Sequence, residues 1–238
     1  MKIAEYKPRD WKSHPPYVFK AYGSSVKRGP LKKLVPIKQT LSEITGPLFS
    51  DIKLEPGEND LTRIAGTNKE AMGERIIVVG RVREEGGRPV PNTLIEIWQA
   101  NAAGRYHHPV DQHNAPLDPN FTGAGRCVTN QKGEYRYLTI KPGAYPWLNH
   151  TNAWRPAHIH LSLFGPSFVT RLVTQMFFPN DPLIPLDPIL NSVPSKSGRE
   201  RLISSYAHDV TEPEFALGYR FDIVLRGRRA TPFEEKKR

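Results

Sequence analysis

The chain has 238 residues, 38% of them hydrophobic, which is enough apolar material for one large domain with a substantial core; two small domains are the alternative. Its formal net charge of +10 gathers near the two ends, at 27–38 and 226–238, without a basic helix or an RNA-binding motif, so nucleic acid is a poor candidate partner. A solvated surface, an acidic partner chain or an anionic small molecule explains the surplus charge better.

The sequence also argues against export and membrane insertion. The first residues, 1–7, contain no apolar core of a signal peptide, and no stretch is long enough to span a bilayer. Cys127 is the only cysteine, so no intrachain disulfide can form, which fits a reducing cytosol. We therefore expect a cytoplasmic protein that does not insert into a membrane, with Cys127 as a small buried apolar residue rather than a reactive thiol.

Residues 1–70 show neither a helical nor a strand period. Seven prolines interrupt them, and the segment 41–44 is the candidate for a short helical turn. We expect an extended arm that packs on the folded core or on a second subunit. The remaining residues, 71–238, are expected to form the folded domain.

Short strands follow one another from Glu74 onward. β-branched and aromatic residues cluster or alternate between turn residues, and the first two such runs are interpreted as an antiparallel hairpin or as neighbouring Greek-key strands. One helix is expected at 197–209, where Leu202 and Tyr206 lie four residues apart. Together these features predict a mainly β protein, a β-sandwich with long loops and few short helices. The predicted strands cover 75–82, 93–99, 133–139, 158–164, 168–178 and 219–225.

A polar segment rich in glycine and proline separates the second and third of these strands. A loop of this length inside a compact domain is usually functional. We interpret its histidines as loop residues or as residues that support a site, and its aspartate as structural. The segment spans 100–125 and holds Tyr106, His107, His108, His113 and Asp118.

The segment Tyr145–His160 combines two histidines, an arginine, a tyrosine and two tryptophans. His158 and His160 lie two positions apart on a predicted strand, so their side chains point to the same face, roughly 7 Å apart along the chain. Pro156 directs the chain into that strand because it blocks a helix. Such a pair suits a metal ion, although many His-x-His pairs are merely polar residues of a strand face.

Two tyrosines strengthen the metal hypothesis. Tyr106 and Tyr145 both lie in Gly- and Pro-rich loops next to strand ends, where a tyrosine is usually an amphipathic wall residue. Two phenolates with two imidazoles would form a distinctive donor set. Phenolate is a hard anionic oxygen, so this set favours ferric iron over zinc. A zinc hydrolase is disfavoured further because no glutamate general base lies beside the histidines.

Specific motifs connect the chain with a known family. From about Tyr22 to Glu234, the sequence resembles the iron-bearing β chains of the protocatechuate 3,4-dioxygenase group of intradiol ring-cleavage dioxygenases. The resemblance implies a non-haem Fe(3+) cofactor held by Tyr106, Tyr145 and the two histidines, with Tyr145 leaving the metal when substrate binds. The motifs are G-E-R-I-I-V-V-G-R-V, P-N-T-L-I-E-I-W-Q-A-N-A-A-G-R-Y, P-L-D-P-N-F, T-I-K-P-G-A-Y-P-W, W-R-P-A-H-I-H and Y-R-F-D-I-V-L-R-G.

The resemblance also implies roles for residues around the metal. Arg155 is the cation beside the reacting ring, and Gln175 lies near the metal-proximal pocket. Trp147 and Ile189 form pocket walls, and Tyr22 contacts the end of the substrate. The alternatives are a structural ion pair for Arg155, a buried backbone partner for Gln175, and plain core packing for the two walls.

The implied reaction is intradiol cleavage of protocatechuate (3,4-dihydroxybenzoate) with O2 to 3-carboxy-cis,cis-muconate, a step of aromatic catabolism in the β-ketoadipate pathway. The implied partner is an iron-free α subunit, so that αβ units build a hetero-oligomer. One alternative is a catechol or hydroxyquinol 1,2-dioxygenase, which the extended proline-rich arm disfavours because those enzymes carry a helical N-terminal domain. The other is a β-sandwich binding module without iron.

Overall fold

The structure is a computed structural model, and it describes residues 13–33, 35, 54–64, 66–147, 154–164, 172–225 and 227–232. The predicted helical turn at 41–44 and the first part of the predicted strand 168–178 lie outside the described residues. Within the described ranges, no helix has both the length and the apolar character needed to cross a membrane.

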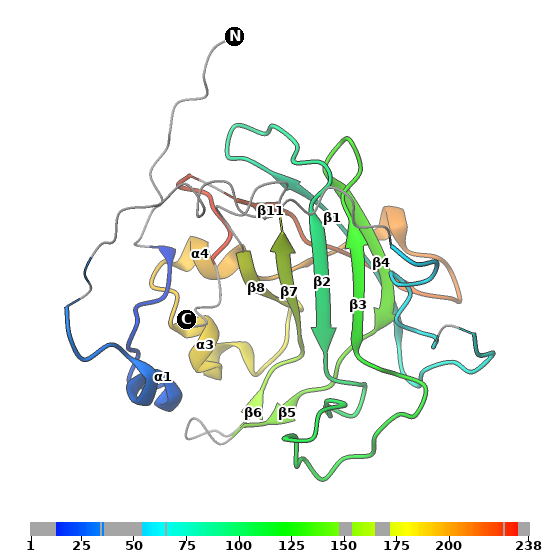
Figure 1. The fold of residues 1–238 in the computed structure, drawn as a ribbon, viewed down its shortest axis with the longest axis horizontal. Coiled ribbons are helices and arrows are strands. Elements are labelled where there is room, and N and C mark those ends of the chain that lie inside the picture. Colours follow the sequence, from blue (N-terminus) through cyan, green and yellow to red (C-terminus); the bar gives the residue numbers. More distant parts are fainter. Residues whose placement is uncertain are drawn as a thin grey trace.

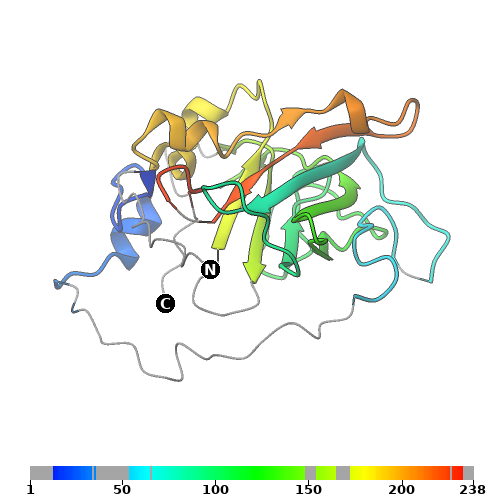
Figure 2. The same cartoon turned by 90° about the horizontal axis from the view of Figure 1, so that it is seen from above.

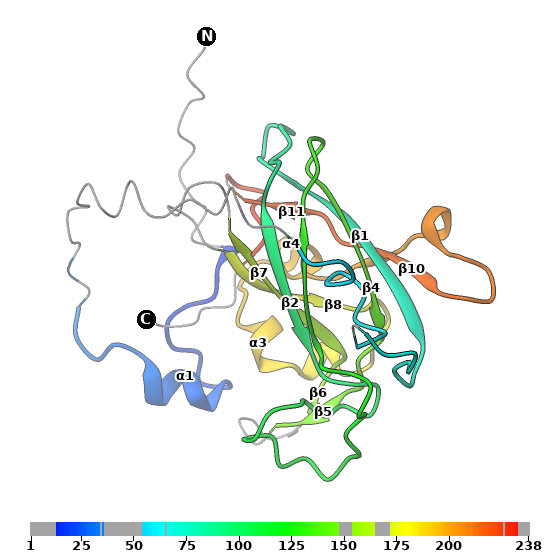
Figure 3. The ribbon, with the colours of Figure 1, turned by 45° about the vertical axis from the view of Figure 1, so that its right-hand side comes forward.

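Two β-sheets face each other (Figures 1 and 3). In the first sheet, β1 (Arg75–Arg83) pairs with β4 (Glu134–Ile140) in antiparallel register on one side. On its other side β1 pairs in parallel with β10 (Leu217–Arg220) and β11 (Ile223–Val224), and β9 (Ser205–Tyr206) continues the sheet beyond β10. The predicted strands at 75–82 and 133–139 are thereby confirmed.

The second sheet is entirely antiparallel and carries the histidine strand. Its order is β3 (Ala124–Val128), β2 (Leu94–Gln99), β7 (His158–Phe164) and β8 (Leu172–Phe177). A two-stranded ribbon of β5 (Tyr145–Pro146) and β6 (Trp154–Arg155) lies beyond it. Because β2 and β7 are central strands, each has a hydrogen-bonded neighbour on both sides, which holds the side chains at their ends in place.

The hydrophobic core fills the space between the sheets, which is the arrangement of a β-sandwich. Alternate residues of the facing strands point inward, and each large aliphatic or aromatic side chain buried there stabilises the fold by about 1.5–3 kcal/mol. Cys127 belongs to this core, which confirms its prediction as a small buried apolar residue, and burial raises the pKa of its thiol to about 12. Core residues include Ile76, Val78, Ile95, Ile97, Tyr135, Tyr137, Ile159, Leu161, Leu163 and Met176.

The described helices are short and lie at the edge of the sandwich nearest β8 (Figures 1 and 2). They are α1 (Gly23–Arg28), α3 (Pro188–Asn191) and α4 (Lys196–Glu200), with a 3₁₀ turn η2 (Ile184–Leu186). A further 3₁₀ turn, η3 (His208–Val210), lies beside β10 instead. The α1 helix, which no sequence pattern predicted, lies in the N-terminal arm. Leu190, Val193 and Leu202 form a smaller apolar cluster with Phe177 beneath this region.

The predicted helix at 197–209 is wrong. The α4 helix ends at Glu200, and the chain then pairs with the end of β8: Phe177 N donates to Leu202 O at 2.8 Å, and Ser204 N donates to Phe177 O at 2.8 Å. Tyr206 belongs to β9. Tertiary strand pairing therefore overrides the helical spacing of Leu202 and Tyr206, because it satisfies the backbone groups that a helix would otherwise pair locally.

Two strand predictions also need correction, and one strand was missed. The runs 75–82 and 93–99 form strands, but they lie in different sheets, so neither the hairpin nor a shared sheet is present. The run 219–225 is divided into β10 and β11, because the side chain of Asp222 takes the place of a backbone acceptor for Arg81 N at 3.0 Å. The β3 strand was not predicted, since its Ala-Gly-Arg-Cys-Val sequence has weak strand propensity.

Gly80 lies where β1 passes closest to the junction between β10 and β11. A Cβ atom at this position would lie 1.9 Å from Phe221 O and 2.8 Å from Tyr135 Oη, and the tyrosine hydroxyl itself donates to Phe221 O. We expect Gly80→Ala to lower the free energy of unfolding by about 1–3 kcal/mol or more, because buried backbone must move. Equilibrium urea unfolding measures this. The matched control is Gly86→Ala, whose added Cβ meets no atom within 4 Å; equal unfolding free energies for the two variants would contradict the prediction.

Candidate metal centre

Four aromatic side chains from three separate segments converge at one end of the second sheet. The ring centroids of Tyr106 and Tyr145 lie 5.3 Å apart, and those of His158 and His160 lie 4.9 Å apart. Tyr145 is 5.4 Å from His158, and Tyr106 is 6.3 Å from His160. The structure therefore brings together all four residues that the sequence proposed as metal ligands.

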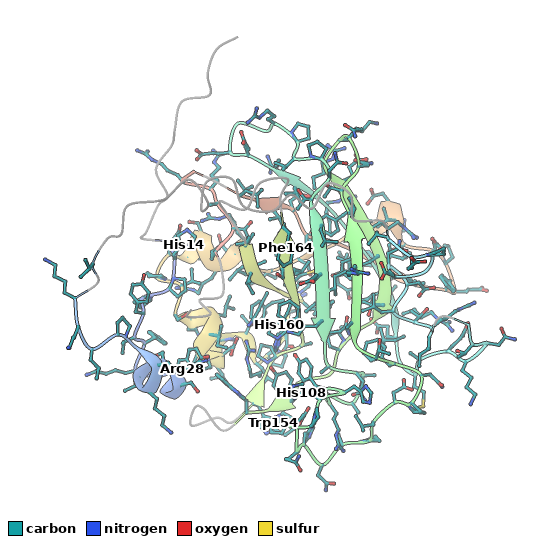
Figure 4. The ribbon with its side chains drawn as sticks, viewed as in Figure 1. His14, Arg28, His108, Trp154, His160 and Phe164 are labelled. Carbon is teal, nitrogen blue, oxygen red and sulfur yellow. The ribbon has the colours of Figure 1, made fainter. Side chains whose placement is uncertain are left out.

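The two histidines share one face of β7, as strand alternation predicted. His158 is 2% exposed and His160 is 8% exposed. Trp98, the cross-strand partner of His160 on β2, stacks on its ring with centroids 4.9 Å apart and planes 8° apart. The ring of His158 packs on Phe177, its partner on β8, with centroids 5.6 Å apart. Figure 4 shows His160 among the strands, well inside the ribbon.

The tautomer of His158 follows from its contacts. Its Nδ1 lies 2.7 Å from the carbonyl of Pro156, which can only accept, so Nδ1 carries the hydrogen. The Nε2 lone pair then faces Tyr145 Oη at 3.2 Å and Arg155 Nη1 at 2.9 Å. Burial, followed by the charge of Arg155 and then His160, holds the pKa of His158 well below its usual range. The imidazole stays neutral, which is the form that binds metals.

The loop that carries Tyr106 is held by its own side chains. Asp111 accepts from the backbone N of Tyr106 at 2.7 Å and from the backbone N of His113 at 2.9 Å. Gly104 has φ +79°, and a Cβ there would lie 2.1 Å from Ala144 O, so the loop packs directly against the segment that enters β5. This close approach, which needs glycine, places the two tyrosine rings next to each other.

Arg155 is the best-connected polar side chain of the site. Its Nη1 donates to Tyr145 Oη at 3.3 Å as well as to His158, and its Nη2 donates to Gln175 Oε1 at 2.6 Å. On its other edge, Nε and Nη2 donate to the two carboxylate oxygens of Asp187 at 3.1 and 2.9 Å. The structural ion pair considered as an alternative is therefore real, and it coexists with contacts to two of the four candidate ligands.

The residues proposed for the substrate end lie on the side of Arg155 facing the arm. The Cζ atom of Arg155 lies 5.5 Å from the ring centroid of Trp147, whose ring is 5.1 Å from that of Tyr22. A small cavity of about 50 Å³ lies between the arm and the α3 helix; Tyr22, Gln175 and Ile189 line it, together with Arg28, which donates to Tyr22 Oη. The structure thus places Tyr22, Arg28, Gln175 and Ile189 around one cavity and brings Trp147 next to Tyr22 and Arg155; the roles of these residues toward a substrate remain predictions.

Several polar loop residues stay apart from the centre. His107 and His108 are exposed, and Figure 4 shows His108 on the loop outside the sandwich. The ring of His113 packs edge-on against Trp154 at 6.1 Å. Asp118 accepts from the backbone N of Met72 at 2.7 Å, which agrees with its structural interpretation.

Sequence reasoning missed Asp187, Trp98 and Asp111. An N-cap signal was present at Asp187, because it precedes Pro188 and an apolar run. That signal locates a helix start, but it says nothing about a partner 32 residues earlier in the chain. For Trp98 and Asp111, no local pattern indicates which side chain or backbone group they contact.

The donor set fits a ferric ion. Two imidazole nitrogens and two phenol oxygens meet at one partly buried point, and phenolate oxygen is a donor that ferric iron prefers. Within the described ranges, no group of three or more His, Cys, Asp and Glu side chains is placed to hold a metal ion. Any metal bound at this point therefore needs the tyrosine oxygens.

Comparisons with known proteins agree with this geometry. Residues 44–227 match the family described as Dioxygenase, and residues 8–40 match the family described as Protocatechuate 3,4-dioxygenase beta subunit N terminal. The chain is 62% identical over 227 residues to the protocatechuate 3,4-dioxygenase beta chain of Burkholderia cepacia, covering 95% of this chain and 96% of that one. It is 31% identical over 166 residues to the protocatechuate 3,4-dioxygenase alpha chain of Pseudomonas putida, covering 69% and 77%.

Solved structures extend the likeness to the fold. The 3-chlorocatechol 1,2-dioxygenase of Rhodococcus opacus 1CP superposes with a TM-score of 0.53 at 22% identity, covering 76% of this chain and 72% of that one. At this identity the likeness concerns the fold alone. It confirms the predicted β-sandwich.

Proposed function

Because the chain belongs to the intradiol ring-cleavage dioxygenase family, we propose that it is the iron-bearing β chain of an enzyme that cleaves protocatechuate with O2 between its two hydroxyl groups. The product is 3-carboxy-cis,cis-muconate, and the reaction belongs to aromatic catabolism through the β-ketoadipate pathway. The observation that carries the proposal is the convergence of Tyr106, Tyr145, His158 and His160 beside a buried arginine.

These four residues would hold a non-haem Fe(3+) ion. When bound, ferric iron supplies the Lewis acidity and the electron-accepting capacity that make a catechol ring reactive toward O2. The neutral Nε2 of His158 supports this assignment, since its lone pair already faces the phenol oxygen of Tyr145. His160, stacked on Trp98 and with its ring centroid 4.9 Å from that of His158, would supply the second imidazole.

Tyr145 is proposed as the residue that takes a proton from the incoming catechol at its Oη. A catechol must lose two protons to bind through both oxygens, so a base within the site is needed. Arg155 Nη1 donates to this oxygen at 3.3 Å, which orients the Tyr145 side chain toward the arginine and His158.

Arg155 and Gln175 are proposed to act on the reacting ring. The guanidinium is always charged, and it can stabilise negative charge that develops on the ring during attack by O2. Because Gln175 Oε1 accepts from Arg155, its amide Nε2 points the other way. That buried Nε2 has no hydrogen-bond partner within the described part of the chain, so it is a donor ready for an oxygen atom of a ligand.

The cavity lined by Tyr22 and Arg28 favours a catechol that carries a carboxylate over catechol itself. Arg28 and Tyr22, which both line the cavity, are joined by a hydrogen bond, and they offer a cation and a hydroxyl to an anionic group. Trp147 and Ile189 are proposed as the apolar walls that hold the ring between this pair and Arg155. Protocatechuate carries the required carboxylate opposite its two hydroxyls, whereas catechol does not.

We also propose the assembly and its setting. Relatives named as alpha and beta chains indicate an αβ assembly, and we propose an iron-free α chain as the partner, in the cytoplasm. Residues 1–70 would be the arm that joins core and partner, and 71–238 the catalytic domain. Two contacts support the packing of the arm on the core. Leu61 belongs to the main core cluster, and the ring of Tyr22 lies 5.1 Å from that of Trp147. The buried Cys127 thiol suits a reducing compartment.

The experiment that tests the function combines a spectrum with turnover. The chain purified with its α partner should be red-brown, because tyrosinate bound to ferric iron absorbs visible light, and it should convert protocatechuate faster than catechol. Product identity by mass spectrometry completes the measurement. A colourless protein with stoichiometric zinc would refute the metal assignment, and a preference for catechol or hydroxyquinol would replace the substrate.

Tyr145→Phe and Tyr106→Phe are expected to differ in kinetics. Without the Tyr145 hydroxyl, the formation of the substrate complex should slow, because the proposed base is lost. Tyr106→Phe should instead alter the visible spectrum of both the resting and the substrate-bound protein. Stopped-flow mixing with substrate separates the two effects. Substrate binding by Tyr145→Phe at the rate of the unmodified protein would count against its role as base.

A further inference from the structure

We propose that Asp187 is a positioning residue that sets the direction of the Arg155 guanidinium at the candidate metal centre. The inference rests on the proposed function, because Arg155 is assigned its role there. The new element is Asp187, which holds the Arg155 guanidinium in the orientation that this role requires. Asp187 does not touch the four candidate ligands; it acts through Arg155.

The geometry of the pair fixes the third nitrogen of the guanidinium. Asp187 Oδ1 accepts from Nε at 3.1 Å and Oδ2 accepts from Nη2 at 2.9 Å, so the carboxylate occupies one whole edge of the planar group. Because the guanidinium is rigid, two fixed nitrogens determine where the third one points. In this structure Nη1 points to Tyr145 Oη and His158 Nε2.

The pair is also isolated from water. The side chain of Arg155 is 2% exposed and that of Asp187 is 0% exposed. A buried charge needs a partner with good geometry, and a guanidinium that lost this carboxylate would turn toward another acceptor or toward solvent. Gln175 Oε1 accepts from Nη2, which is also bonded to Asp187 Oδ2, so the Gln175 contact does not restrain Nε.

Asp187 has a second attachment that makes it a rigid anchor. It is the N-cap residue of α3, where its carboxylate accepts from Leu190 N at 3.3 Å and Pro188 begins the helix. The same helix carries Ile189, which lines the cavity beside Gln175. One carboxylate therefore ties the arginine at the centre to the element that walls the proposed substrate pocket.

The test is a double-mutant cycle with Asp187→Asn and Arg155→Gln in the full chain, co-purified with its α partner. Asparagine keeps the shape and the cap but offers one acceptor where the arginine needs two. We expect D187N alone to lower kcat by up to about 100-fold, as misplacement of a catalytic group does. In the R155Q background, D187N should cause no further loss, because the residue through which it acts is gone.

Two readouts do not depend on turnover. D187N should shift the visible absorption band of the resting ferric protein, as R155Q does, and should add no shift to R155Q. In a crystal structure of D187N, Arg155 Nη1 should lie beyond hydrogen-bond reach of Tyr145 Oη. If the unmodified protein fails to turn over protocatechuate, the proposed substrate is wrong, while the band and the crystal structure still decide the role of Asp187.

The matched control is Ser195→Ala, which removes the N-cap contact of the neighbouring α4 helix, where Ser195 Oγ accepts from Gly198 N at 2.9 Å. It should lower thermal stability and leave kcat and the visible absorption band unchanged.

An unchanged kcat and absorption band in D187N, or an equal fall in kcat in both backgrounds, would overturn the proposal. If D187N alone does not fold, the double variant should, because it removes both charges; an equally unstable double variant also overturns it.

Discussion

Replacing His160 by alanine is expected to remove most of the bound iron and, with it, the dioxygenase activity. His160 supplies one of only two imidazoles in the proposed donor set, and its ring is held between Trp98 and the other aromatic residues of the centre. A methyl group in its place leaves three donors and a gap next to the indole. Three donors bind the ion more weakly, so iron should be lost during purification.

Iron content by atomic emission and turnover of protocatechuate measure this effect. His108→Ala is the control, because His108 belongs to the loop that bears Tyr106 but is exposed, and its Nδ1 accepts from Val110 N at 3.2 Å. It should retain iron and activity. Thermal unfolding of both variants separates metal loss from loss of fold. His160→Ala protein with full iron and full activity would remove this residue from the ligand set.

The second large effect concerns the partner chain. Made alone, the protein is expected to be poorly soluble or inactive, and co-expression with an α chain should restore turnover. Leu31 is 98% exposed and Val35 is 80% exposed, and both lie in the arm. Covering each such side chain would contribute about 1.5–3 kcal/mol. The net charge of +10 suits an acidic partner, since complementary charge speeds and orients association.

Sedimentation velocity and turnover, with and without the α chain, measure this effect. Active material should sediment as a hetero-oligomer, and the inactive chain should regain activity when the partner is added. Leu31→Ser with Val35→Ser should weaken the assembly without changing the visible spectrum. A monomer or homodimer that carries iron and has full protocatechuate activity would refute the prediction and favour the catechol alternative.

Strand content and the orientation of the histidines could be predicted from the sequence because both depend on neighbours along the chain. The β-branched run of β1 and the alternation in β7 are local patterns, and alternation alone places His158 and His160 on one face. Loop position and donor chemistry made Tyr106 and Tyr145 candidates, and motif resemblance then implied that both are ligands, which remains a prediction. No local pattern connects them with the histidines.

Tertiary structure decided everything that depends on which strands become neighbours. Residues 197–209 have a helical spacing, yet the segment after α4 pairs with β8 and β10, since their backbone groups were available there. Pairing between backbone groups of segments distant in sequence also placed β1 and β2 in different sheets, and it made residues 124–128 a strand.

The Arg155–Asp187 pair shows this division most clearly. Each residue could be interpreted from the sequence by itself, as a site cation and as a helix N-cap signal. Their contact joins β6 to the start of α3 across 32 residues, and only the folded chain brings the two charges together away from water. Local patterns determine the conformation of a segment, whereas burial and charge pairing depend on long-range contacts, which the sequence by itself does not specify.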